Sequence, residues 1–110
     1  MSDKSQDRIK QLFQSYRDSL PERMYELDEL WGQLALSWDA EAADEFDRTC
    51  HGLAGSALTF DCSEVGDIAR QIEILFKSQL QNNSPVPPEL ISEIRALLSE
   101  LSEVISKVST

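Results

Sequence analysis

The stretch that decides the fold runs from Ala42 to Phe60 and reads AADEFDRTCHGLAGSALTF. Its apolar side chains recur at alternating steps of three and four residues, which is the period of a helix with one buried stripe. The stripe comprises Ala43, Phe46, Cys50, Leu53, Ala57 and Phe60. Strand-like alternation is absent from the sequence, so this segment is predicted to be a helix that packs against other helices.

The same spacing predicts four more helices. One carries Ile9 to Leu20, and the next opens at Pro21, because proline is tolerated in the first turn of a helix. Helix starts are also expected after Asp39 and Ser63, two residue types that cap free N–H groups. On the fourth helix, Glu73 and Lys77 are placed to pair on the outer face. A polar, proline-rich loop, residues 79–90, leads into the last helix, which ends near residue 108.

The predicted fold is therefore all-α. Short links between helices favour antiparallel neighbours, which gives an up-down four-helix bundle with an additional N-terminal helix. A length of 110 residues suffices for one hydrophobic core, so residues 1–110 are expected to form a single domain, most simply a monomer.

Charge and composition exclude several classes of function. Twenty acidic against ten basic residues give a net charge of -10, which repels nucleic acid and anionic membranes. Cys50 and Cys62 lack metal-site or redox spacing and are expected to be buried free thiols. Neither a signal peptide nor a membrane span is recognisable, so a cytoplasmic protein is expected.

The single histidine, His51, lies about 130° around the helix from the centre of the apolar stripe. It is thus predicted to face solvent or a partner, on the same face as Arg48, Ala54, Gly55 and Leu58. Glycines at positions 52 and 55 each lower helix stability by about 1 kcal/mol relative to alanine, so a functional reason for them is expected. Gly55 leaves one side of the imidazole bare for the close approach of another protein.

This setting limits the chemistry of His51. Acid–base catalysis needs a cleft and a second group, and a metal site needs further ligands, so neither an enzyme nor a bound cofactor or metal is expected. A neutral imidazole can, however, accept a phosphoryl group on a ring nitrogen and return it when a partner supplies the acid and the metal.

At these residues the chain resembles the histidine-containing phosphotransfer (HPt) domains of bacterial multistep phosphorelays. Their motif reads histidine, any residue, leucine, commonly lysine, glycine and a small residue; here His51, Gly52, Leu53, Ala54, Gly55 and Ser56 stand at these positions. The resemblance implies that His51 accepts a phosphoryl group from the aspartate of a receiver domain or from a hybrid sensor kinase, with Mg²⁺ on the partner. It also implies that Gly55 makes room for the incoming receiver.

The sequence departs from the family pattern twice. Ala54 replaces the usual lysine, and Asp61 replaces a glycine common near the end of the helix. Arg48 on the same helix and Arg70 on the next are the cations expected to stand in for that lysine. The alternative hypothesis is a helical adaptor of the same fold that binds a receiver or kinase without accepting phosphate.

Overall fold

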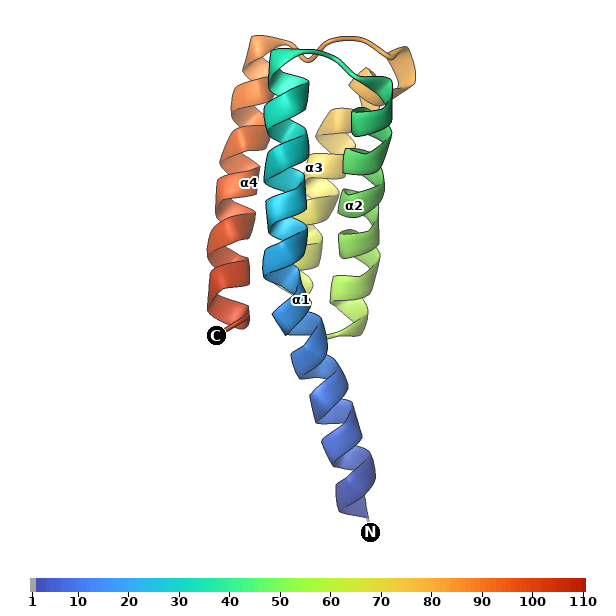
Figure 1. Ribbon diagram of the computed structural model, residues 1–110, viewed down its shortest axis with the longest axis vertical. Helices are drawn as coiled ribbons and strands as arrows, with labels where there is room; N and C mark the ends of the chain where they lie inside the picture. Colours follow the sequence, from blue (N-terminus) through green and yellow to red (C-terminus); the bar gives the residue numbers. More distant parts are fainter. Residues whose placement is uncertain (1) are drawn as a thin grey trace.

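Four helices form an antiparallel bundle in the computed structural model, which describes residues 2–110 and side chains from Lys4 onward. They are α1 (Ser2–Leu36), α2 (Ala40–Thr59), α3 (Ser63–Asn82) and α4 (Pro88–Val108). Successive helices run in opposite directions, and α1 lies between α2 and α4 (Figure 1). The prediction of an all-α, up-down four-helix bundle is confirmed.

The prediction of an additional N-terminal helix is wrong. Residues 2–36 form one continuous helix, and Pro21 lies inside it. The apolar stripe continues across the proline, since Leu20, Met24 and Leu27 are all buried, and this packing offsets the lost N–H. Because Pro21 is exposed, its ring does not disturb the core.

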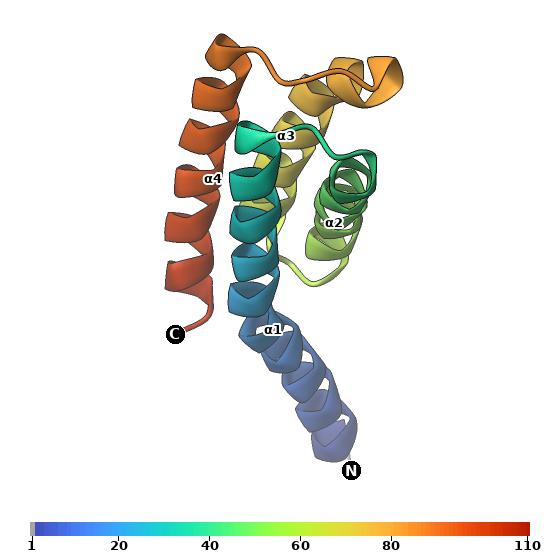
Figure 2. The same ribbon diagram turned by 45° about the horizontal axis from the view of Figure 1, so that its top comes forward.

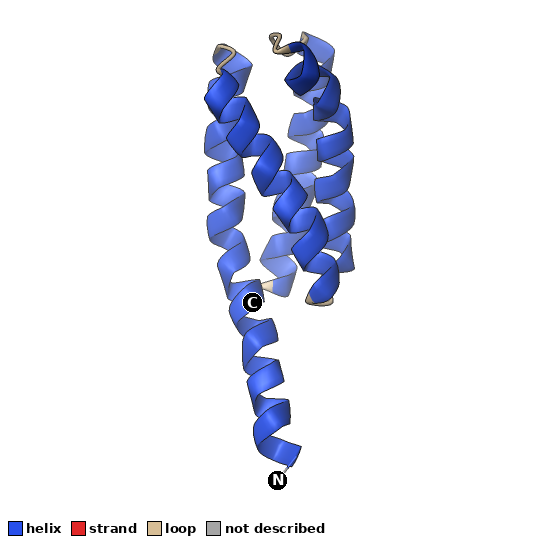
Figure 3. Ribbon diagram, turned by 90° about the vertical axis from the view of Figure 1, so that its right-hand side faces the viewer, coloured by secondary structure: helices blue, strands red, loops and turns tan. Residues whose placement is uncertain are grey.

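The amino-terminal part of α1 extends beyond the other helices (Figures 1 and 3). This extension is anchored where it leaves the bundle: Tyr16 stacks on Phe60 at 4.4 Å between ring centroids, and Phe13 meets the same ring edge-on. The Tyr16 hydroxyl is also hydrogen-bonded to Ser56 at 2.8 Å. The direction in which the extension leaves the bundle is therefore fixed by α2.

Aromatic side chains fill the opposite half of the core. The ring centroids of Trp31, Phe46 and Phe76 lie 5.1–6.0 Å apart, and all three side chains are buried. Trp38 packs on Phe76 and donates its indole N–H to Asn83. Asn83 begins the connection from α3 to α4, which crosses the end of the bundle (Figure 2). The aromatic core joins α1, α2 and α3, and the hydrogen bond ties together two connections at the same end of the bundle.

Specific residues determine where α2 begins and where it ends. Asp39 accepts hydrogen bonds from the N–H groups of Glu41 and Ala42, which confirms the predicted cap. After α2 the chain turns at Asp61, whose φ of 61° lies in the left-handed region that favours glycine. The glycine expected here from the family pattern thus matches a backbone requirement that aspartate meets less easily. At α3, Cys62 rather than Ser63 occupies the cap position, without a side-chain hydrogen bond.

Helices α2 and α3 approach each other closely at Gly66. A Cβ atom at that position would lie 3.2 Å from the Ala54 carbonyl oxygen and 3.4 Å from Ala57 Cβ. The absence of a side chain at Gly66 and the small alanines opposite it let the two backbones come together. Side chains further along α3 are thereby brought within reach of the outer face of α2.

Candidate functional site

His51 lies near the middle of α2, and its side chain is 72% exposed. The four neighbouring stripe residues that point the other way, Phe46, Cys50, Leu53 and Ala57, are fully buried. The orientation predicted from the helical period is therefore confirmed, and the imidazole is open to a partner.

One contact from α3 fixes the imidazole. The Nδ1 atom of His51 lies 2.7 Å from Oε2 of Glu73, whose side chain is only 22% exposed. An ionised carboxylate only accepts hydrogen bonds, so Nδ1 carries the hydrogen and donates it. In the neutral ring the lone pair then resides on Nε2. The arrangement presents Nε2 as the nucleophilic atom.

Beyond His51 the helix surface is open. A Cβ atom built on Gly55 would meet nothing within 4 Å, so no contact within the chain requires glycine at this position. Leu58, two turns from His51, is exposed. Gly55 and Leu58 thus lie where the sequence predicted, on an uncovered face beside the histidine.

The prediction that Ala54 lies on this exposed face is wrong. Its side chain is buried, and its carbonyl oxygen lies against Gly66 of α3. The close approach of α3 covers this flank of α2, which the period of one helix cannot reveal. A lysine at position 54 would have to extend along the edge of α3 to reach solvent.

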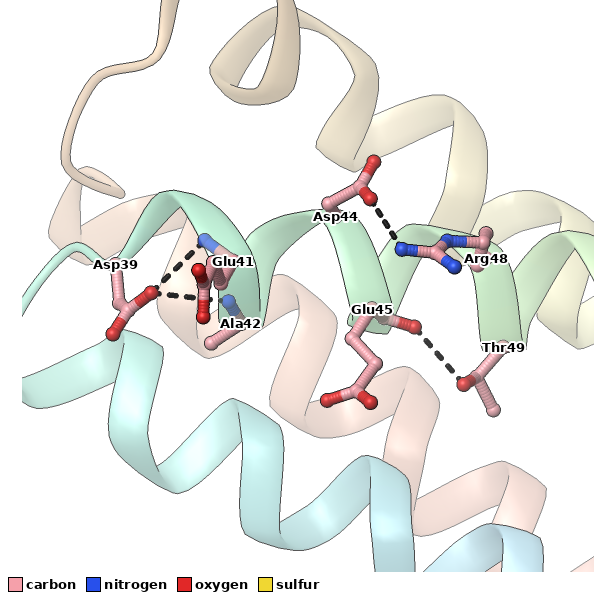
Figure 4. Close-up of polar contacts among 7 residues, drawn as sticks. All are labelled: Asp39, Glu41, Ala42, Asp44, Glu45, Arg48 and Thr49. Carbon is pink, nitrogen blue, oxygen red and sulfur yellow. Dashed lines mark hydrogen bonds and ion pairs between the residues drawn. The ribbon is translucent and has the colours of Figure 1, made fainter.

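Arg48 is turned away from the histidine. Its guanidinium lies 2.6 Å from the Asp44 carboxylate, one turn further from His51 (Figure 4). The same figure shows the Asp39 cap and the Thr49 hydroxyl, which donates to the Glu45 carbonyl. Because Arg48 is exposed and already paired, it is a weaker candidate for a phosphoryl contact than the sequence suggested.

The second predicted cation, Arg70, borders a groove between α2 and α3. This groove, of about 320 Å³, is also lined by Asp47, Glu73 and Lys77. Arg70 and Lys77 lie one turn before and one turn after Glu73, the residue that holds the imidazole. Two cationic side chains therefore flank the histidine's carboxylate partner.

Asp47 adds negative charge on the α2 side of this groove. Partial burial raises the pKa of its carboxyl group, and the nearby Glu73 carboxylate raises it further, while His51 acts in the opposite sense. The site therefore combines the imidazole of His51 with two carboxylates and two cations.

Sequence reasoning missed Glu73 and Lys77 as members of the site. It predicted that they pair with each other, whereas the Glu73 carboxylate contacts His51. Spacing along a single helix cannot report a contact between two helices. Gly66, two turns before Glu73, is the signal that could have indicated the close helix pair.

The two cysteines and the metal-binding residue types are also candidates for chemistry. Cys50 and Cys62 are buried free thiols, as predicted, and burial raises the pKa of both. Within the described part of the chain, no three His, Cys, Asp or Glu side chains are grouped so that they could hold a metal ion. None of the helices described contains an apolar segment long enough to cross a membrane.

Comparison with known proteins agrees with this geometry. The family model described as the Hpt domain matches residues 11–104. Searches of curated proteins and of solved structures return no significant match. The matched region spans most of α1 and all of α2 and α3, and it includes both His51 and Glu73. The chain belongs to the Hpt domain family.

Proposed function

We propose that this chain is a phosphorelay intermediate that accepts a phosphoryl group on Nε2 of His51 from a receiver-domain aspartate or a kinase and passes it to another receiver. Membership of the Hpt family supports the general role in phosphorelays. The observation that carries the specific assignment is the 2.7 Å contact between Nδ1 of His51 and Glu73, combined with the exposure of the ring.

The transfer step follows from this geometry. The Nε2 lone pair attacks phosphorus, an N–P bond forms, and the P–O bond to the aspartate breaks, so the aspartate leaves as a carboxylate. Nδ1 keeps its hydrogen, and the ring therefore gains positive charge as the bond forms. The Glu73 carboxylate faces that charge and stabilises it. In the reverse step the same ring gives the phosphoryl group to a second aspartate.

Around the phosphorylated ring, cations of the α2/α3 groove offset part of the negative charge. A phosphoryl group adds about -1.5 to -2 charges near Asp47 and Glu73. Arg70 and Lys77 border the same groove and are the described cations best placed to offset this charge. They take the role that the sequence comparison gave to a lysine at position 54.

The docking surface is the open face of α2. Gly55 gives the partner backbone or phosphoryl group room beside His51, and Leu58 offers an exposed apolar contact. Such a surface suits the receiver domain or hybrid sensor kinase implied by the family. The chain itself contributes the acceptor, and the partner contributes the phosphorylated aspartate and Mg²⁺.

Transfer of label separates this function from an adaptor that only binds. Incubated with phosphorylated receiver domains and Mg²⁺, the chain is expected to acquire a label that is stable in alkali and labile in acid. His51→Gln should abolish labelling without loss of helicity by circular dichroism. A receiver that binds the chain, and transfers no phosphoryl group to it, would establish the adaptor instead.

A further inference from the structure

The amino-terminal extension of α1 carries an apolar face that the bundle does not cover. Ile9 and Leu12 are 54% and 60% exposed. They lie one turn apart, on the line that continues through Phe13 and Tyr16 to the buried Leu20. The stripe that builds the core therefore continues beyond the bundle without a partner.

A second uncovered apolar feature lies between α3 and α4. A groove of about 500 Å³ is lined by Gln71, Ile74, Leu75, Glu93, Ala96 and Leu97. Its walls come from little more than one turn of each helix. The groove is therefore long enough to hold two side chains that lie one turn apart on a docked helix, as Ile9 and Leu12 do.

The charges of the two features are complementary. Residues 4–17 carry four basic and one acidic side chain, whereas residues 18–110 carry 18 acidic and 6 basic side chains. The basic residues Arg8 and Lys10 flank Ile9 on the extension, and Glu93 lines the groove. A basic helix docked beside Glu93 gains from charge pairing at the rim as well as from apolar burial.

The extension cannot reach the groove of its own chain. Residues 2–36 form one uninterrupted helix whose first turns point away from the bundle (Figure 1). Folding back would require a break in that helix, and the contacts of Phe13 and Tyr16 with Phe60 hold its direction. The helix and the groove can therefore meet only between two copies of the chain.

We propose that two copies of this chain form a dimer in which the α1 extension of each copy places Ile9 and Leu12 in the α3/α4 groove of the other. Ile74, Leu75 and Leu97 supply the apolar contacts in the groove. Each subunit contributes one helix and one groove, and when each helix fills the groove of the other copy, no site is left open and the assembly closes as a two-fold dimer. The proposal does not depend on phosphorylation of His51.

Sedimentation velocity across a range of protein concentrations tests the association. The wild-type chain is expected to shift from monomer to dimer as concentration rises, and Leu12→Glu is expected to remain monomeric. Gln11→Glu introduces the same charge about 130° around the helix from the midpoint of Ile9 and Leu12, outside the apolar face, and should dimerise like the wild type. A wild-type chain that stays monomeric throughout, or equal behaviour of the two variants, would overturn the proposal.

A cross-link tests the pairing itself. Chains carrying only Leu12→Cys are mixed with chains carrying only Ala96→Cys under oxidised glutathione, and products are identified by mass. Cys50 and Cys62 are buried and do not compete. The mixed disulfide is expected to dominate, because it forms only where the two Cα atoms lie within about 7 Å. Predominance of the Leu12→Cys homodimer would show helix-to-helix pairing and contradict the groove assignment.

Discussion

At the scale of single residues, the carboxylate of Glu73 has two effects on His51: it orients the ring, and it faces the positive charge that the proposed phosphorylation of Nε2 would place on the ring. Its side chain is largely shielded from water, which strengthens both effects relative to an exposed ion pair. Glu73 is thus a positioning residue for the acceptor, although it does not touch the phosphoryl group in the proposed reaction.

Substitution of Glu73 should slow transfer. A hydrogen bond to a charged group contributes about 1.5–3 kcal/mol, so Glu73→Ala is expected to lower the rate of phosphoryl transfer by about 10-fold to 100-fold. Glu73→Gln keeps an acceptor oxygen without the charge, so its transfer rate should fall between those of the wild type and Glu73→Ala. Rapid-quench measurement of label transfer gives these rates, with Glu64→Gln, an exposed position in the first turn of α3, as control. Unchanged rates in Glu73→Ala would contradict the assigned role.

Asp47 makes a prediction about stability and pH. Its pKa is raised in the folded state, chiefly by burial, so its contribution to stability is present at acid pH and is lost as pH rises through the raised pKa. Asp47→Asn should therefore increase the free energy of unfolding at neutral pH and give no gain near pH 3.

Urea unfolding followed by circular dichroism at both pH values measures this effect. Asp44→Asn is the matched control, because Asp44 lies one turn away on the same helix and is exposed and paired with Arg48. A gain for Asp47→Asn of equal size at both pH values would rule out the electrostatic explanation.

At the scale of elements, the close contact of α2 and α3 decides which side chains reach the histidine. Gly66 allows that contact, because a Cβ atom there would press on the Ala54 carbonyl oxygen at 3.2 Å. Gly66→Ala is expected to lower the free energy of unfolding by about 1 kcal/mol, since overpacking outweighs the gain in helix propensity.

Gly32→Ala provides the matched control for Gly66→Ala. Gly32 lies inside α1, and a Cβ atom there would meet nothing within 4 Å. The same substitution should therefore stabilise the chain by about 1 kcal/mol, measured by urea denaturation. Equal gains at both positions would show that α2 and α3 can separate without cost.

The sequence was sufficient for features that repeat along one helix. The period of α2 predicted the exposure of His51 and the burial of Phe46, and the residue type at Asp39 predicted its cap. It failed where a second element decides the outcome. Pro21 resembles a helix start, but the bundle stabilises a continuous α1, and Ala54 is covered by α3. Contacts between helices do not follow from the spacing within one.

At the scale of the whole molecule, a chain with a net charge of -10 is proposed to receive its partner on the open face at Gly55. Gly55→Gln should fold at least as stably as the wild type, because its new Cβ atom meets nothing, yet it should impede docking of a receiver. Transfer rates at rising receiver concentration measure the effect, with Gly32→Gln as control. Transfer by Gly55→Gln at the wild-type rate would show that no partner approaches there.

The assignment of Nε2 as the acceptor is the central claim, and nitrogen NMR of the phosphorylated chain tests it most directly. With ¹⁵N-labelled histidine, the single imidazole of His51 gives one pair of ring signals. We expect that Nε2 carries the phosphoryl group and that Nδ1 keeps its hydrogen, held by Glu73. Phosphorylation on Nδ1 would contradict the assignment of Nε2. Phosphorylation that is still observed in the His51→Gln variant would contradict the assignment of His51 itself.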